Sequence, residues 1–229
     1  MSFLKQYEKI INNEMEKLKN EISIILFTDF KSNNGEKVRK CMACERSLTI
    51  LEKLAEAAAG KLKVIEFSTE ENQDKASKYK IEKIPTILFL DDNEEELIRY
   101  KATPEGSELV PFIKTLQYYS GINSYYKDQI LTHLSKIPSS EIQLFITLTC
   151  PYCPTVLPIV TLFSIISEGK ITSEIIDIDA NPSDAMEYKV SSVPHAIINE
   201  KDHIYGMFTP QDLLDKLTKG KRDFGGMYA

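Results

Sequence analysis

The sequence predicts an α/β protein made of two tandem units, each with a central mixed β-sheet flanked by helices. Its four cysteines all lie in two Cys-x-x-Cys tetrapeptides, Cys41-Met-Ala-Cys44 and Cys150-Pro-Tyr-Cys153. In each half a proline follows the first cysteine by 44 residues, Pro85 in one half (85 − 41 = 44) and Pro194 in the other (194 − 150 = 44). Each half also carries a Thr-Pro dipeptide near its end. Two cysteine pairs in one internal frame indicate a duplicated redox unit.

Composition excludes several classes of protein. The chain of 229 residues is long enough for two domains of roughly 100 residues each. Its 42% hydrophobic and 27% charged residues are typical of a globular protein. The net charge of −6 argues against general nucleic-acid binding, which needs a basic surface. No apolar run approaches the roughly 20 residues that span a bilayer, and the amphipathic start does not resemble a signal peptide. We therefore expect a cytoplasmic protein that binds neither nucleic acid nor membranes.

Hydrophobic patterning predicts the elements of the first half in order. An amphipathic run predicts a leading helix at about 3–20, and a continuous apolar run predicts a buried strand at 22–27. After the first cysteine pair follow a helix up to Gly60, a strand at 63–67, a polar helical stretch, a strand at 86–90 and a return strand at about 97–100. Thr103 and Pro104 then predict the N-cap and first position of a closing helix.

The second half repeats this plan. Its predicted elements are helices at 124–137 and 154–168, strands at 142–146, 174–178 and 196–199, a turn at 200–202 and a return strand at 204–207. Thr209 and Pro210 predict the start of the last helix. We expect the boundary near Gly121, which gives units of 1–121 and 122–229, and we expect the tail from about 220 to fray.

The cysteine spacing predicts a redox-active dithiol in each unit. When the first cysteine caps a helix and the second lies in its first turn, the two sulfurs come within bonding distance. The helix N-terminus stabilises a thiolate on the first sulfur. We therefore predict that Cys41 and Cys150 are the nucleophiles. Cys44 and Cys153 are the resolving residues that release a mixed disulfide.

The two prolines extend this prediction. An Ile84-Pro85 or Val193-Pro194 pair before an apolar strand favours a cis peptide bond in a tight turn. Such a turn brings backbone groups up to the cysteine loop, where a substrate peptide pairs with them like a strand. The alternative is an ordinary turn proline.

These segments resemble the thioredoxin-fold protein disulfide oxidoreductases of archaea and thermophilic bacteria, which fuse two thioredoxin-like units with one Cys-x-x-Cys each. The resemblance covers about 3–219 and is most specific in 149–154 and 193–199. Cys-Pro-Tyr-Cys is also the glutaredoxin tetrapeptide. The resemblance implies thiol–disulfide exchange on protein substrates, with the cis-proline turns facing each dithiol.

The chain departs from the family pattern at three places. Leu144 stands six residues before Cys150, where thioredoxins proper carry a buried aspartate that assists proton transfer. In the first unit Asp29 ends the strand, but the segment 31–40 is an apparent insertion before Cys41. Met42-Ala43 is an unusual pair between the cysteines.

Several neighbours of the dithiols are candidates for substrate-binding or modulating roles. Lys40 adjoins Cys41 in a basic segment that either stabilises a thiolate or is a solvated loop. Tyr152 is expected to shield the second dithiol and to touch substrate. Ile84 and Val193, which precede the prolines, are assigned to the same contact region.

The histidines indicate a functional role less clearly than the cysteines and prolines do. His195 follows Pro194, so its ring lies either near the Cys150 sulfur, where it would stabilise a thiolate, or at a strand end without such a role. His133 and His203 are expected on the surface.

The lead hypothesis is a cytosolic enzyme for cell redox homeostasis, a dithiol–disulfide oxidoreductase that reduces or oxidises protein disulfides and, as an extension, isomerises them. One alternative is a dedicated redox carrier between a flavin reductase and a partner such as a peroxiredoxin. A minor one is a structural zinc protein in which the two cysteine pairs form a four-thiolate site. The sequence carries no dinucleotide fingerprint, so electrons must come from another protein or a small thiol, and we assign no cofactor. We also assign no metal. We expect a thioredoxin-reductase-like flavoprotein as electron donor.

Overall fold

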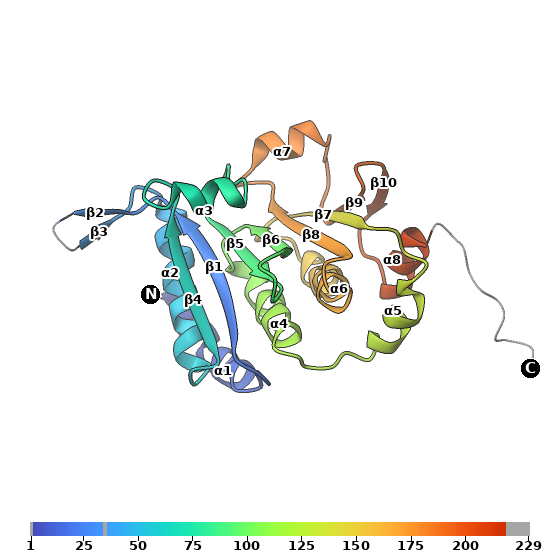
Figure 1. Cartoon of the computed structure of the whole chain (residues 1–229), viewed down its shortest axis with the longest axis horizontal. Coiled ribbons are helices and arrows are strands. Elements are labelled where there is room, and N and C mark those ends of the chain that lie inside the picture. Colours follow the sequence, from blue (N-terminus) through green and yellow to red (C-terminus); the bar gives the residue numbers. More distant parts are fainter. Residues whose placement is uncertain (1, 34–35, 219–229) are drawn as a thin grey trace, which may run out of the picture.

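An eight-stranded mixed sheet forms the centre of the computed structural model, which describes residues 2–33 and 36–218. Its strands are β1 Ile22–Thr28, β4 Leu62–Ser68, β5 Thr86–Leu90, β6 Glu96–Lys101, β7 Ser140–Ile146, β8 Ile171–Asp177, β9 His195–Ile198 and β10 Asp202–Tyr205. They are ordered β4–β1–β5–β6–β8–β7–β9–β10, from left to right in Figure 1. The α/β prediction with a mixed sheet in each half is confirmed.

Helices cover this sheet on both faces. They are α1 Ser2–Met15, α2 Met42–Ala57, α3 Gln73–Lys78, α4 Leu109–Tyr119 with the preceding 3-10 turn η1 Gly106–Glu108, α5 Lys127–Leu134, α6 Cys153–Ile166, α7 Pro182–Glu187 and α8 Pro210–Leu217. No helix in the described part of the chain is long and apolar enough to cross a membrane. The tail from about 220, expected to fray, lies outside the described residues.

The two halves have the same strand order and fuse along one edge. In the first, β1 pairs in parallel with β4 and antiparallel with β5, and β5 pairs with β6. In the second, β7 pairs in parallel with β8 and antiparallel with β9, and β9 pairs with β10. Strand β6 then pairs in parallel with β8, so that Ile98 lies opposite Ser173. This junction turns two four-stranded sheets into one.

One apolar core spans both halves on one face of the sheet. It joins α1, α2, α4 and α6 through buried side chains such as Met15, Leu54, Phe112 and Val160. At its centre Thr115 of α4 and Thr161 of α6 share a buried hydrogen bond of 2.9 Å. The opposite face carries two separate small clusters, which contain Phe27, Tyr79 and Leu88 in the first half and Phe145, Ile176 and Ile197 in the second. The units therefore share their main core.

The predicted start of the first closing helix is wrong. Thr103 and Pro104 do not cap it, because α4 begins at Leu109 after η1. The cause is a contact between the halves: the Ser107 N–H and hydroxyl both donate to the Leu148 carbonyl, at 3.0 and 2.9 Å. Gly106 has φ +60°, and a Cβ there would lie 2.5 Å from the Leu148 oxygen, so this turn needs glycine.

The matching prediction in the second half is confirmed. Thr209 caps α8, with Pro210 in its first turn, and Asp212 returns the bond to complete a capping box. The leading helices are shorter than predicted, since α1 ends at Met15 and α5 covers Lys127–Leu134. The predicted boundary near 121 falls in the connection between α4 and α5.

Candidate active site

Each cysteine pair lies between the carboxyl end of a buried parallel strand and the start of a helix, β1 and α2 in one unit and β7 and α6 in the other. Both pairs form disulfides, with Cα–Cα distances of 5.2 Å for Cys41–Cys44 and 5.5 Å for Cys150–Cys153. Three strands, β5, β6 and β8, stand between β1 and β7. The two pairs therefore do not meet, and the four-thiolate zinc alternative is wrong.

The first dithiol has the predicted helix-capping geometry. Cys41 is the N-cap of α2, and its Sγ accepts the Cys44 N–H at 3.0 Å. Cys44 is fully buried, whereas Cys41 is partly exposed. Only the Cys41 sulfur is therefore open to a substrate, and an N–H donor is already aimed at its thiolate form.

The second dithiol has a similar contact at its first sulfur, but its helix starts at a different position. Its helix begins at Cys153 with Tyr152 as N-cap, so Cys150 does not cap it as predicted. In the first unit the Glu45 N–H closes the first turn onto the Cys41 carbonyl at 3.2 Å; the equivalent residue here is Pro154, which has no N–H to make this bond, so the helix starts later. The Cys150 Sγ nevertheless accepts the Cys153 N–H at 3.0 Å. Cys150 is 5% exposed and Cys153 is 0% exposed, so the order of accessibility is kept.

Both prolines form the predicted cis peptide bonds, Ile84–Pro85 and Val193–Pro194. Thr86 lies opposite Phe27 and His195 opposite Phe145, so each proline stands at the sheet end where the cysteine loop leaves. Both prolines are buried, while Ile84 and Val193 are half-buried. In the second unit the Gly206 N–H donates to the Pro194 carbonyl at 2.8 Å, which fixes the turn.

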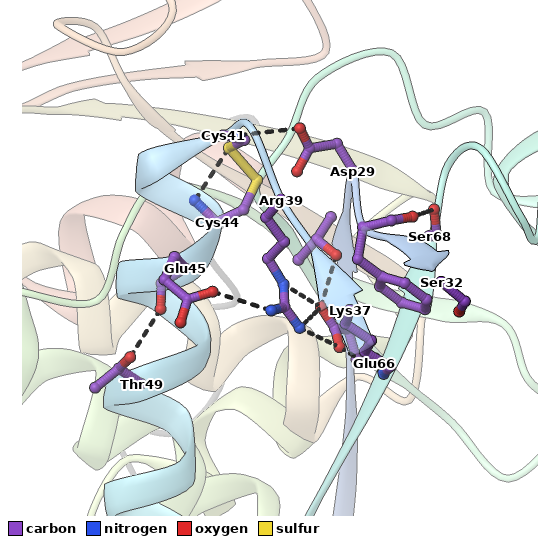
Figure 2. A network of polar contacts seen from close by, with 12 residues as sticks. Asp29, Ser32, Lys37, Arg39, Cys41, Cys44, Glu45, Thr49, Glu66 and Ser68 are labelled. Carbon is purple, nitrogen blue, oxygen red and sulfur yellow. Dashed lines mark hydrogen bonds and ion pairs between the residues drawn. A yellow bond between two sulfur atoms is a disulfide. The ribbon is translucent and has the colours of Figure 1, made fainter. Parts of the chain in front are cut away.

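A carboxylate lies beside the first dithiol (Figure 2). Asp29 Oδ2 accepts the backbone N–H groups of Lys40 and Cys41, at 3.1 and 2.9 Å. Asp29 Oδ1 is buried and has no hydrogen-bond partner. One oxygen of Asp29 and the sulfurs of Cys41 and Cys44 all lie within 4.8 Å of one another. The strand end that the sequence indicated thus holds a charged group at the reacting atoms.

The basic segment before Cys41 is an antiparallel hairpin, β2 Lys31–Asn33 and β3 Glu36–Val38. Its charge is directed at Glu66 on β4 (Figure 2): Arg39 donates Nε and Nη2 to this carboxylate at 2.8–3.0 Å, and Lys37 binds it at 2.9 Å. Burial acts to raise the pKa of Glu66, but bonds from Thr28, Lys37 and Arg39 hold it below its usual value. Lys40 is exposed and joins the site through its backbone N–H.

The second dithiol has no such group on its own strand, because Leu144 is an apolar core residue. A buried carboxyl group of the first unit lies next to a residue that contacts the loop before Cys150. Glu108 at the end of η1 is fully buried, its Oε2 has no partner, and the adjacent Ser107 binds Leu148 on the loop that leads to Cys150. Burial, together with the charge of Asp177, raises the pKa of Glu108 to about 7.

Two further acids surround Glu108 in the shared core. Tyr100 and Asp177 lie on the same face of adjacent strands, β6 and β8, with Tyr100 opposite Ile175. The Tyr100 hydroxyl is buried without a partner, and burial raises its pKa well above the usual value, with added repulsion from Glu108 and Asp177. Burial also raises the pKa of Asp177. Sequence reasoning missed this cluster, although an acid directly before the apolar start of α4 was an available signal.

His195 lies on the opposite face of the sheet from the second dithiol. Its ring packs against Phe145 and Tyr205, and its Nε2 is 2.8 Å from His203 Nδ1. The neighbouring Ala196 shares the main core with Cys150 instead. Alternation along β9 thus turns His195 away from Cys150, so of the two placements left open by the sequence the structure has the strand-end one. Burial, and then the charge of His203, lower the pKa of His195.

Other predicted side chains are placed as follows. Tyr152 is 54% exposed next to Cys153, so it is free to touch a substrate. His203, predicted on the surface, is half-buried as the partner of His195. His133 is also half-buried, with Nδ1 2.9 Å from the Gln129 carbonyl.

Comparison with known proteins follows the same division. A thioredoxin family profile matches residues 37–115, and a thioredoxin-domain profile matches residues 140–219. Thioredoxin of Bacillus subtilis is 36% identical over 72 residues, which is 31% of this chain and 69% of that protein. The alkyl hydroperoxide reductase AhpF of Staphylococcus aureus is 27% identical over 142 residues, or 62% of this chain. The chain matches 27% of the length of that relative.

Two solved structures share the tandem fold. A protein disulfide oxidoreductase from Aeropyrum pernix K1 superposes with a TM-score of 0.77 at 24% identity, over 97% of this chain and 96% of that one. A mutant of the alkylhydroperoxide reductase AhpF from Enterococcus faecalis superposes with a TM-score of 0.76 at 21% identity, over 93% and 98%. The chain therefore belongs to the thioredoxin family and carries two of its units in tandem, each with one Cys-x-x-Cys pair.

Proposed function

We propose that the protein is a two-site dithiol–disulfide oxidoreductase that reduces and oxidises protein disulfides and, with both sites together, isomerises them. One observation carries the proposal: each pair exposes its first sulfur more than its second, and an N–H donor contacts that first sulfur. The cis-proline turn at the same sheet end offers backbone groups to a substrate strand.

In reduction, the Cys150 thiolate attacks one sulfur of a substrate disulfide. A mixed disulfide forms, and the departing substrate sulfur takes up a proton. Cys153 then loses its proton and attacks the Cys150 sulfur, which breaks the mixed disulfide and releases the second substrate thiol. The substrate gains two electrons and two protons, and the Cys150–Cys153 disulfide remains. Oxidation runs through the same steps in reverse, and Cys41 and Cys44 take the equivalent roles.

We assign Glu108 as the group that takes the Cys153 proton. It is a buried carboxyl on η1, which contacts α6, and it follows Ser107, which binds the loop before Cys150; its pKa of about 7 suits proton exchange near neutral pH. Asp29 has the corresponding place beside Cys41 and Cys44.

The direct test is insulin reduction by the purified protein with dithiothreitol as reductant. We expect catalysis by the parent chain and by each variant that keeps one dithiol, Cys41→Ser/Cys44→Ser or Cys150→Ser/Cys153→Ser. A chain with all four cysteines replaced is the control. Exchange by that control at the parent rate would refute the assignment of the cysteines.

Isomerisation needs both sites in one chain, because one opens a wrong disulfide while the other closes a correct one. We expect the parent to reactivate scrambled ribonuclease faster than an equimolar mixture of the two single-dithiol variants. This comparison keeps the β6–β8 junction intact, which a cut near 121 would expose on both sides. Equal rates would remove isomerisation and leave reduction and oxidation standing.

A dedicated redox carrier is the second candidate, favoured by the similarity to the alkyl hydroperoxide reductase AhpF. In this role the chain passes electrons from a thioredoxin-reductase-like flavoprotein in the cytoplasm to one partner, such as a peroxiredoxin. Failure to reduce insulin, together with rapid reduction of a peroxiredoxin disulfide, would favour the carrier over the general oxidoreductase.

A further inference from the structure

We propose that the reduced first dithiol and Asp29 form a binding site for a thiophilic divalent cation such as Zn²⁺, and that oxidation of the dithiol releases the ion. The ligand atoms of Asp29, Cys41 and Cys44 lie within 4.8 Å of one another. Ligand atoms around a tetrahedral zinc are about 3.5–3.8 Å apart, given Zn–S bonds of about 2.3 Å and Zn–O bonds of about 2.0–2.2 Å. The three groups therefore need only small movements to share one ion.

The unused oxygen of Asp29 is an independent observation for this site. Asp29 Oδ2 is held by the N–H groups of Lys40 and Cys41, which fixes the carboxylate beside the sulfurs (Figure 2). Asp29 Oδ1 is buried and accepts no hydrogen bond. A buried oxygen without a partner is costly, and a metal bond would satisfy it. Two thiolates and one carboxylate leave a fourth position open for water or a small ligand.

The surrounding charges favour this ion. Two thiolates and a carboxylate carry −3, so the complex with Zn²⁺ carries −1 and is stabilised by the N-terminus of α2. The nearby cations Lys37 and Arg39 are paired with Glu66, and Arg39 also with Glu45, so two positive and two negative charges balance before an ion enters.

The second dithiol provides an internal comparison. Leu144 gives it no carboxylate, and among residues 2–33 and 36–218 the first site is the one group of three such ligands that lies close enough for an ion. The site requires chemistry as well as geometry, because a disulfide offers no thiolate. Two electrons and two protons from an added dithiol reduce Cys41–Cys44. Binding of Zn²⁺ then releases the two thiol protons, and the bound dithiol is withheld from exchange.

The test is titration of the full-length, dithiol-reduced protein with Co²⁺ under argon, followed by competition with Zn²⁺. The Cys150→Ser/Cys153→Ser variant, which keeps the first site, should bind one equivalent and give sulfur-to-cobalt charge-transfer absorption. Asp29→Asn keeps the shape and the contact with the backbone N–H groups, so it should fold normally but bind at least about 10-fold more weakly, since even residues that only support a ligand cost that much. The Cys41→Ser/Cys44→Ser variant should bind no more tightly than Asp29→Asn, and oxidised protein should not bind.

Circular dichroism and the melting temperature verify the fold of each variant. Equal affinity in Asp29→Asn and its parent would overturn the proposal, as would tighter binding by the Cys150 pair than by the Cys41 pair. Because the readout is metal affinity, it is separate from insulin reduction, which tests the proposed exchange function.

Discussion

The two dithiols obtain their neighbouring carboxyl groups in different ways. The first takes Asp29 from the end of its own strand, fixed by N–H groups of the loop that carries Cys41. The second has Leu144 within its strand, and the carboxyl group that we assign to it, Glu108, belongs to the first unit and follows Ser107, which binds Leu148. One site is thus self-contained, whereas the other depends on the junction between the units. Duplication here has produced two unequal sites that share one core.

The largest effect is expected from single cysteine substitutions, which should inactivate one site at a time. Cys150→Ser and Cys41→Ser should each abolish exchange at their own site and leave the other active. Cys153→Ser and Cys44→Ser should instead accumulate mixed disulfides with substrate, since the exposed sulfur can attack but cannot be resolved. Mass spectrometry of trapped complexes measures this. Trapping by the first-cysteine variants would reverse the assigned roles.

The next largest effect is expected from Glu108→Gln. In a Cys41→Ser/Cys44→Ser background we expect exchange at the second site to slow by about 100-fold, the lower range for general acid–base catalysis. The rise in rate through pH about 7 should also disappear, since that step follows ionisation of Glu108. In a Cys150→Ser/Cys153→Ser background the same substitution is the matched control and should change little. An equal loss at both sites would contradict the proposed dependence on the junction.

The burial of Glu108 should also affect the pH dependence of the free energy of unfolding. Burial raises the pKa of Glu108 from 4.5 to about 7, so its contribution to stability is complete below about pH 4.5 and is lost as the pH rises through about 7. A shift of 7 − 4.5 = 2.5 corresponds to about 3 kcal/mol. Urea unfolding of the parent and of Glu108→Gln between pH 4 and 8 measures it. The difference between the two proteins should move by about this amount, and a constant difference would refute the burial argument.

The smallest effect is expected at His195. Its ring faces away from Cys150, so His195→Asn should change exchange at the second site by less than about twofold. The variant should lose about 1 kcal/mol of unfolding free energy with the His203 hydrogen bond. Single-site exchange rates and urea unfolding give the two numbers. A tenfold loss of rate would restore the link between His195 and the thiolate.

Sequence predicted the features that local patterns encode. The cysteine spacing, the prolines before strands and the apolar runs gave the two dithiols, both cis peptide bonds and the strands, because each depends on neighbours in the chain. Features decided by distant contacts were missed. The start of α4 depends on Ser107 meeting Leu148, 41 residues away, and our assignment of Glu108 to the second site rests on the same contact.

For a similar reason the sequence did not decide which way the His195 ring points. Its number in the chain places it next to Pro194, but the direction of its ring depends on the register of β9 against β7, in which it lies opposite Phe145. A shift of one residue would have turned the ring to the other face. The pairing of β6 with β8 could not be predicted either, because the sequence pattern of each half by itself does not show contacts between the halves.

The continuous sheet also fixes the distance between the two disulfides. Strands β1 and β7 run in the same direction and are four strand spacings apart, so their cysteine loops leave the same end of the sheet about 19 Å from each other, at about 4.8 Å per spacing. The two cysteine pairs are therefore too far apart for direct thiol–disulfide exchange with each other within one molecule. An extended substrate segment of about six residues, at about 3.3 Å each, would span them. Under the proposed function, substrates whose cysteines are held at that separation are those that both sites would engage at once.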